Sequence, residues 1–186
     1  MALIPYPDAD SIDAEAQAAI DSFAKDHGRP TLLRQILAWS PPALEAMEDL
    51  YHPIFLGGVL SREFKEMLFV AASQARECPY CAGGHSRLLV QEFGYDEADV
   101  RVMREGDSNN AWSEKDRLLV AYVRKIAVDP AGTVGADLES LREVGWTDEE
   151  LTESTAMAAH AAWTTAVAQT FHLEHDLDGP DFDGYF

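Results

Sequence analysis

The only two cysteines of the chain are separated by two residues, in the segment Glu77-Cys78-Pro79-Tyr80-Cys81-Ala82-Gly83-Gly84-His85. Three kinds of chemistry use such a pair: a structural disulfide, a metal site or a redox-active dithiol. A disulfide that closes so short a ring removes little entropy from the unfolded chain, and a reducing cytosol would keep it open. A structural disulfide is therefore the weakest of the three interpretations.

A zinc site is the second interpretation. Structural zinc takes four ligands, commonly two Cys-x-x-Cys pairs or one such pair with two histidines. Cys78, Cys81 and His85 could supply three ligands, and His160, His172 or an acid could supply the fourth. The position of His85, one helical turn beyond Cys81, differs from the usual spacing, in which the remaining ligands return from a distant segment. We therefore expect neither a bound metal nor another cofactor.

A redox-active dithiol is favoured because the motif should begin a helix. Pro79 suits the first helical position and Cys78 the N-cap, which places Cys81 in the first turn. Free backbone N–H groups and the positive end of the helix dipole favour a thiolate there. His85 lies at i+4 from Cys81, so that the two side chains share one face and the imidazole can act as a base. Thioredoxin-like folds need a βαβ context, whereas helices flank this motif.

An acid of the preceding helix is a candidate proton acceptor. Glu66 precedes the apolar run 67–70. In one straight helix over residues 62–85, Glu66 and Cys81 would lie about 22 Å apart. A break at Pro79 would let the two helices fold back as a pair and bring Glu66 over the motif.

The rest of the chain reads as helices, and no segment is a convincing strand. Capping residues, prolines and glycines predict helices from Asp13 to about Lys25, from Ser40 to about Leu50, from Ser61, from Pro79 to Phe93, from Asp96 to Gly106, from Ser113 to about Val128, and from Thr147 to about Leu173. We expect an all-α domain of eight or nine helices, with the Cys-x-x-Cys motif at a helix N-terminus.

Length and charge limit the classes of function. The chain has 186 residues and a formal net charge of −19, and we expect a single domain over 1–186 with its core at about 28–173. Scattered basic residues argue against binding to nucleic acids or anionic membranes. Neither a membrane span nor a signal peptide is expected, which favours the cytoplasm. The final segment 174–186 reads as a solvated acidic tail, with its acids at Glu174, Asp176, Asp178, Asp181 and Asp183.

The spacing of the reactive residues resembles that of a known family. Ser61-Arg62-Glu63-Phe64-Lys65-Glu66, eleven further residues and then Cys78-x-x-Cys81-x-x-x-His85 resemble the alkylhydroperoxidase D-like (AhpD-like) branch of the carboxymuconolactone decarboxylase superfamily. The likeness extends over roughly residues 28–173, from the segment that begins Gly28-Arg29-Pro30 to Gly145-Trp146-Thr147-Asp148-Glu149-Glu150.

The resemblance implies a thiol-dependent peroxidase that assembles as a homo-oligomer, as trimers or hexamers. Cys81 would be the peroxidatic cysteine and Cys78 the resolving one, with Glu66 and His85 as the proton relay. The substrate would be a hydroperoxide, and the reductant a dithiol donor of the thioredoxin-like or lipoyl type. The well-studied peroxidases of this branch have a second histidine between the cysteines, where this chain has Tyr80.

Two alternatives from other classes stay open at this stage. One is a lactone-processing or other ring-processing enzyme of the carboxymuconolactone decarboxylase type, in which the cysteines are incidental. The other is a helical oligomer without catalytic activity, stabilised by zinc or purely structural. Phe55, Leu56 and Tyr80 could line an apolar peroxide pocket beside the motif.

Overall fold

The computed structural model describes residues 2–27, 30–105 and 112–174. The helices of these residues, in chain order, are η1 (Ala9–Ser11), α1 (Ala14–His27), α2 (Leu32–Leu37), α3 (Pro41–Tyr51), η2 (His52–Leu56), α4 (Arg62–Ala75), α5 (Pro79–Gln91), α6 (Glu97–Glu105), α7 (Glu114–Val128), η3 (Pro130–Gly132), α8 (Gly135–Glu143) and α9 (Asp148–Thr170). The part of the chain that the structure describes contains no strand. The predicted all-α fold is confirmed.

Side-chain caps start most helices where the sequence predicted them. The Asp13 carboxylate accepts a hydrogen bond from the backbone N–H of Glu15 at the start of α1. The hydroxyls of Ser61, Ser113 and Thr147 likewise accept a backbone N–H three residues on, at the starts of α4, α7 and α9. Each cap satisfies a backbone donor that the first turn leaves without an intrahelical partner.

Two short helices and one irregular turn had no predicted counterpart. The six-residue α2 begins after Thr31, whose hydroxyl accepts the backbone N–H of Arg34. The α8 helix has Val134 at its N-cap, a residue whose side chain cannot accept a hydrogen bond. A π-helical turn, η2, extends α3 from His52 to Leu56 and places Phe55 in the core.

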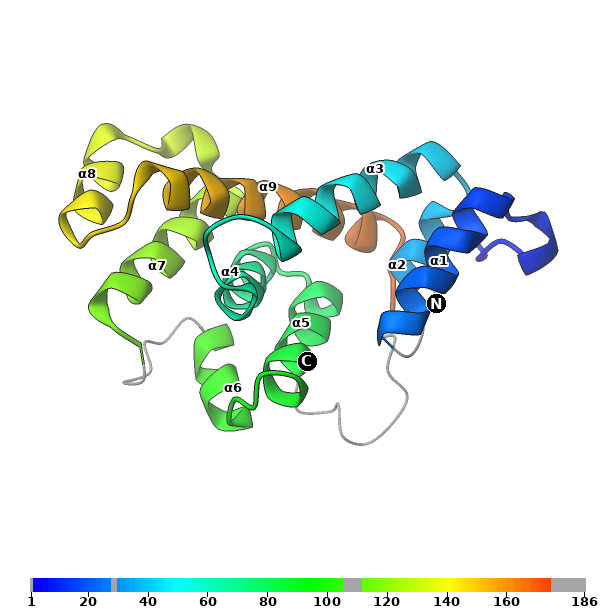
Figure 1. The fold of residues 1–186 in the computed structure, drawn as a ribbon, viewed down its shortest axis with the longest axis horizontal. Helices are drawn as coiled ribbons and strands as arrows, with labels where there is room; N and C mark the ends of the chain where they lie inside the picture. Colours follow the sequence, from blue (N-terminus) through cyan, green and yellow to red (C-terminus); the bar gives the residue numbers. More distant parts are fainter. Residues whose placement is uncertain (1, 28–29, 106–111, 175–186) are drawn as a thin grey trace.

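Helix α4 lies at the centre of the fold and packs against α5, α7 and α9 (Figure 1). Nine consecutive residues of α4, from Lys65 to Ser73, are buried. A helix that is buried on every side must satisfy its polar side chains within the protein. The side chains of Lys65 and Glu66 are therefore expected to have partners of opposite charge.

Polar contacts join α9 to α4 near both ends of α4. Near the start of α4, the ammonium group of Lys65 pairs with the carboxylate of Glu153. Beyond its end, Arg76 Nε donates to Thr165 Oγ1 at 2.6 Å. The longest helix therefore fixes both ends of the central one.

Two clusters of buried apolar side chains make up the interior. The larger cluster extends over residues from α1 to α9. The smaller one lies between α4, α5 and α6 and consists of Met67, Val70, Leu89, Val100 and Met103. Both cores border α4, which accounts for the burial of that helix.

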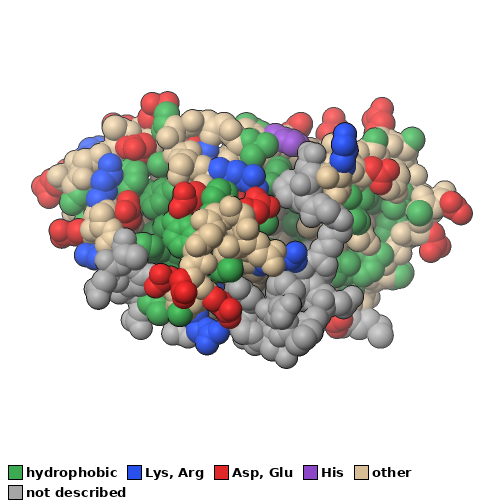
Figure 2. Space-filling view, turned by 60° about the horizontal axis from the view of Figure 1, so that its bottom comes forward, with side chains coloured by type: hydrophobic (Ala, Val, Ile, Leu, Met, Phe, Trp, Pro, Cys, Tyr) green, Lys and Arg blue, Asp and Glu red, His purple; other side chains and the backbone are tan. Residues whose placement is uncertain are grey.

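Charge is scattered over the face seen in Figure 2, where the basic side chains lie close to acidic ones. The tail acids Asp176, Asp178, Asp181 and Asp183 lie outside the described residues, as do Gly28, Arg29 and Gly106. Among the described residues, none of the helices combines the length and the apolar character that a bilayer span requires.

Candidate active site

A tight turn between α4 and α5 positions the cysteine motif. The backbone N–H of Cys78 donates to the carbonyl of Ser73, and that of Glu77 donates to the carbonyl of Gln74, both at 3.0 Å. These are the two hydrogen bonds of a Schellman motif, which ends α4. Glu77 has a φ of 55°, the left-handed conformation that this motif requires. The chain thus reverses at residues 76–78, just before Pro79, where the break was predicted.

Two other helices hold this turn in place. The Nη1 atom of Arg76 donates to the carbonyl oxygen of Ala127 in α7, at 2.8 Å. The side-chain amide of Gln169, in α9, donates to the carbonyl oxygens of Arg76 and Glu77, at 2.8 and 3.1 Å. The carbonyls left free at the end of α4 are therefore satisfied by a distant segment, which orients the residues that follow.

The two sulfurs are free thiols and both are buried. Cys78 is 1% exposed and Cys81 is 4% exposed. The side-chain hydrogen bond from Cys81 lowers the pKa of the Cys78 thiol. The backbone N–H groups of Cys81 and Tyr80 and the charge of Arg76 act in the same direction, whereas burial opposes them. The sequence placed the preference for a thiolate at Cys81, which stays a prediction, and the lowered pKa found here is that of Cys78.

Glu66 and His85 form a direct pair at the α4–α5 contact. Glu66 Oε2 and His85 Nδ1 lie 2.5 Å apart, and the Glu66 side chain is fully buried while that of His85 is 21% exposed. A carboxylate only accepts hydrogen bonds, so Nδ1 carries the hydrogen and Nε2 remains the basic atom of the ring. The predicted approach of Glu66 to the motif is present in the structure.

Aromatic rings fix the orientation of His85. The Phe69 ring lies 3.9 Å from the imidazole and the Phe55 ring lies 5.5 Å from it, as distances between ring centroids. Both phenylalanines are buried. The imidazole thus packs against two apolar rings with its Nδ1 atom on the carboxylate, which leaves it little rotational freedom.

Arg62 is a further member of the site that the sequence did not single out. Its Nε atom lies 3.6 Å from Glu66 Oε1, and its Nη2 atom lies 3.4 Å from Glu92 Oε2. Glu66 Oε1 has no hydrogen-bond partner among the described residues. The buried carboxylate therefore lies between an imidazole on one side and a guanidinium group on the other.

A second histidine lies beside the same aromatic rings. His160, in α9, is 4% exposed, and its ring centroid lies 5.7 Å from that of Phe55 and 6.0 Å from that of Phe69. Burial, and then the charges of His85 and Arg34, lower the pKa of His160 to about 4. The ring is therefore neutral near pH 7. The sequence favoured a core or interface role for His160, and only the tertiary fold brings it near His85.

Tyr80 lies between the two cysteines in sequence, but its hydroxyl has a contact elsewhere. The backbone N–H of Leu33, in α2, donates to Tyr80 Oη at 3.1 Å. Tyr80 thereby joins the start of α5 to α2.

Among the described residues, no group of three or more His, Cys, Asp or Glu side chains is arranged to hold a metal ion.

Comparison with known families supports the interpretation of the sequence motifs. The family model "Carboxymuconolactone decarboxylase family" matches residues 41–114, a segment that includes Glu66, Cys78, Cys81 and His85. No curated protein matches the sequence.

Solved structures share the fold at low sequence identity. An uncharacterized peroxidase-related protein with an alkylhydroperoxidase AhpD core, from Ralstonia eutropha JMP134, aligns with a TM-score of 0.84 and 22% identity, over 100% of this chain and 97% of its own. An uncharacterized peroxidase-related protein from Silicibacter sp. TM1040 gives 0.81 and 22%, over 98% and 94%. A variant of the debrominase Bmp8 in complex with 2,3,4-tribromopyrrole gives 0.78 and 15%, over 95% and 92%. The predicted resemblance and the AhpD-like fold are confirmed.

Proposed function

We propose that this chain, a relative of the AhpD-like branch of the carboxymuconolactone decarboxylase superfamily, is a thiol-dependent peroxidase. The observation that carries the proposal is the pairing of the buried Glu66 carboxylate with His85 Nδ1, at 2.5 Å, one helical turn from the free thiol pair. An imidazole held by a carboxylate is a suitable proton acceptor for a neighbouring thiol.

In the proposed first half-reaction, the Cys81 thiol loses its proton to the His85 relay and the thiolate attacks the distal oxygen of a hydroperoxide. The O–O bond breaks, the leaving alkoxide takes a proton and departs as the alcohol, and Cys81 becomes a sulfenic acid. Glu66 stabilises the imidazolium that forms during the proton transfer. Two electrons pass from one sulfur to the peroxide.

In the second half-reaction, the Cys78 thiolate attacks the sulfur of the sulfenic acid, the S–O bond breaks, and the hydroxide takes up a proton from the relay or from solvent and leaves as water, which leaves a Cys78–Cys81 disulfide. The lowered pKa of Cys78 supports this role because it favours the thiolate form of the attacking sulfur. An external dithiol, of the thioredoxin-like or lipoyl type, then reduces the disulfide by exchange. The Tyr80 hydroxyl accepts the Leu33 N–H, and we assign it no role in the relay.

The compartment, the oligomeric state and the partners that we propose follow from the same resemblance. We place it in the cytoplasm, as a trimer or hexamer of identical chains, without nucleic-acid or membrane partners. A reducing compartment suits the proposal, because both cysteines must return to the thiol form after each turnover.

The experiment is a measurement of peroxide consumption by the purified protein with dithiothreitol as the electron donor. We expect turnover by the wild type, none by Cys81→Ser, and a trapped sulfenic acid or mixed disulfide in Cys78→Ser, detected by mass spectrometry. If Cys81→Ser still forms a sulfenic acid, on Cys78, the two roles are reversed. If Cys81→Ser turns over as fast as the wild type, the proposal fails.

The same variants separate the remaining alternatives. A ring-processing enzyme with incidental cysteines would keep its turnover of a lactone substrate in the double variant Cys78→Ser/Cys81→Ser. A helical oligomer stabilised by zinc would contain stoichiometric metal and lack titratable thiols, as elemental analysis and a thiol assay would show.

A further inference from the structure

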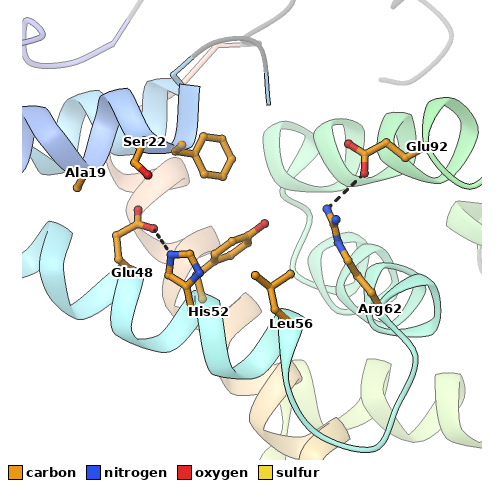
Figure 3. A pocket seen from close by; sticks show the side chains of 9 residues that line it. Ala19, Ser22, Glu48, His52, Leu56, Arg62 and Glu92 are labelled. Atoms are coloured by element: carbon orange, nitrogen blue, oxygen red, sulfur yellow. Dashed lines mark ion pairs between the residues drawn. The ribbon is translucent and has the colours of Figure 1, made fainter. Parts of the chain in front are cut away.

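A pocket of about 360 Å³ is lined by residues of α1, of α3 and η2, of the start of α4 and of the end of α5. In Figure 3, α1 and the end of α3 lie on one side of it, and Arg62 and Glu92, at the start of α4 and the end of α5, lie on the other. Phe23, Tyr51 and Leu56 give the pocket apolar walls. Its volume is within the range of sites that hold small organic molecules.

Two lining residues connect this pocket to the proposed relay. Arg62 faces the buried Glu66 carboxylate at 3.6 Å. The Tyr51 ring lies 5.0 Å from that of Phe55, which in turn stacks on His85. Burial, and then the charge of Glu66, raise the pKa of Tyr51 to about 12, so its phenol stays neutral. A molecule in the pocket would therefore be separated from the Glu66–His85 pair by Arg62 on one path and by Tyr51 and Phe55 on the other.

Arg62, Glu92 and Glu48, which line the pocket, already have partners of opposite charge. Arg62 lies between Glu66 and Glu92, at 3.6 and 3.4 Å. The lining residue Glu48 is bound by Arg34, at 2.7 and 3.3 Å. A carboxylate that entered would meet Glu92, and the arginine beside it already faces two acids. The pocket is therefore unfavourable for anionic ligands.

Arg62 nevertheless keeps hydrogen-bonding capacity. Its Nε and Nη2 atoms are buried toward Glu66 and Glu92 without a hydrogen bond to them, but the side chain as a whole is 32% exposed and lines the pocket. A guanidinium group whose charge is matched, and part of which still faces the pocket, suits an uncharged oxygen acceptor.

We propose that this pocket binds the organic part of an uncharged hydroperoxide and rejects substrates that carry a carboxylate. This proposal rests on the proposed function. The aromatic or branched apolar body would lie between Phe23, Tyr51 and Leu56, and the peroxide group would extend past Arg62 toward Cys81. The pocket would thus select for charge as well as for shape.

Two matched probes test the charge preference without any turnover. We would titrate the reduced protein, at about pH 8, where histidines are ordinarily neutral, with 2-phenylpropan-2-ol and with 4-(2-hydroxypropan-2-yl)benzoate, and follow binding by NMR. The two molecules share the same body and differ by one carboxylate. We expect the alcohol to bind at least about tenfold more tightly. Equal or tighter binding of the carboxylate would overturn the proposal.

Substitutions that fill the pocket test whether the substrate binds there. Leu56→Trp should lower the ratio of kcat/KM for cumene hydroperoxide to that for hydrogen peroxide about tenfold and weaken binding of the alcohol probe. Ser22→Trp, on the α1 wall, serves as a second filling variant should the first fail to fold. The control is Val59→Trp, an exposed position outside the pocket, which should leave the ratio unchanged.

The outcomes separate this proposal from the proposed function. If both filling variants keep the wild-type ratio and the wild-type probe affinity, the pocket is not the substrate site, although the peroxidase proposal stands. If the wild type consumes no peroxide but binds the alcohol in a way that Leu56→Trp abolishes, the binding site stands and the peroxidase proposal falls.

Discussion

Replacing Glu66 by glutamine tests the proposed proton relay most directly. The change keeps the size of the side chain and removes the charge that faces His85 Nδ1 at 2.5 Å. The charge centres of an imidazolium and this carboxylate would lie about 4 Å apart, which is worth about 4 kcal/mol at an effective dielectric constant of about 20. If the imidazolium forms in the rate-limiting step, Glu66→Gln should slow Cys81 oxidation by up to about 10³-fold.

The assay is stopped-flow oxidation of the reduced protein by a hydroperoxide, followed by tryptophan fluorescence. Glu63→Gln is the matched control, because Glu63 is on the same helix but accepts a hydrogen bond from Tyr95 instead of His85. The control should react at the wild-type rate. Thermal melting of both variants would show whether the fold is kept.

Stability should change far less than rate in Glu66→Gln. The amide oxygen can still accept the Nδ1–H of His85, and Arg62 keeps Glu92 as a partner. We expect a loss of about 1 kcal/mol in the free energy of unfolding, or about 2–4 °C in Tm. A Glu66→Gln protein that is oxidised at nearly the wild-type rate would refute the relay, and so would an equal slowing in Glu63→Gln.

Two further predictions concern the turn that carries the thiols. Glu77→Gly should raise the free energy of unfolding by about 0.5–1 kcal/mol in urea titrations, because glycine relieves the strain at φ 55° at some cost in chain entropy; a lower midpoint would contradict this. Cys81→Ala should raise the pKa of Cys78, measured by thiolate absorbance against pH, whereas Cys81→Ser should keep part of the lowering because its hydroxyl still donates. Because the folded-state pKa of Cys78 is lowered, its ionisation stabilises the wild type fully above the pKa of the unfolded thiol, and this contribution is lost as the pH falls through the folded value. A pKa of Cys78 that is the same in Cys81→Ala and in the wild type would contradict the assignment.

The helices and their starts could be predicted because their signals are local. A capping hydroxyl such as that of Ser61 or Thr147 and the N–H that it satisfies lie within one turn of the chain. The contact of Glu66 with His85 could also be predicted, since a hairpin between consecutive helices brings their facing residues together. A short helix such as α2, with six residues, gives too little periodicity to be found.

The parts of the site that escaped prediction depend on contacts between segments. Arg62 reads as a surface residue until the register of the hairpin places Glu92 beside it. His160 enters the site from α9, and nothing in the residues around it points to His85. The direction of the hydrogen bond between the thiols, from Cys81 to Cys78, depends on side-chain geometry that a spacing of three residues does not specify.

The contact of α9 with both ends of α4 has a consequence for how relatives of this chain are compared. The segment that matches the family model, 41–114, contains every residue to which we assign chemistry, yet it ends well before α9 begins at Asp148. Helix α9, whose Gln169 holds the turn before the cysteines, thus lies outside the segment that the family model matches. Two proteins could therefore share all four reactive residues and still hold them with different rigidity, according to what their C-terminal halves supply.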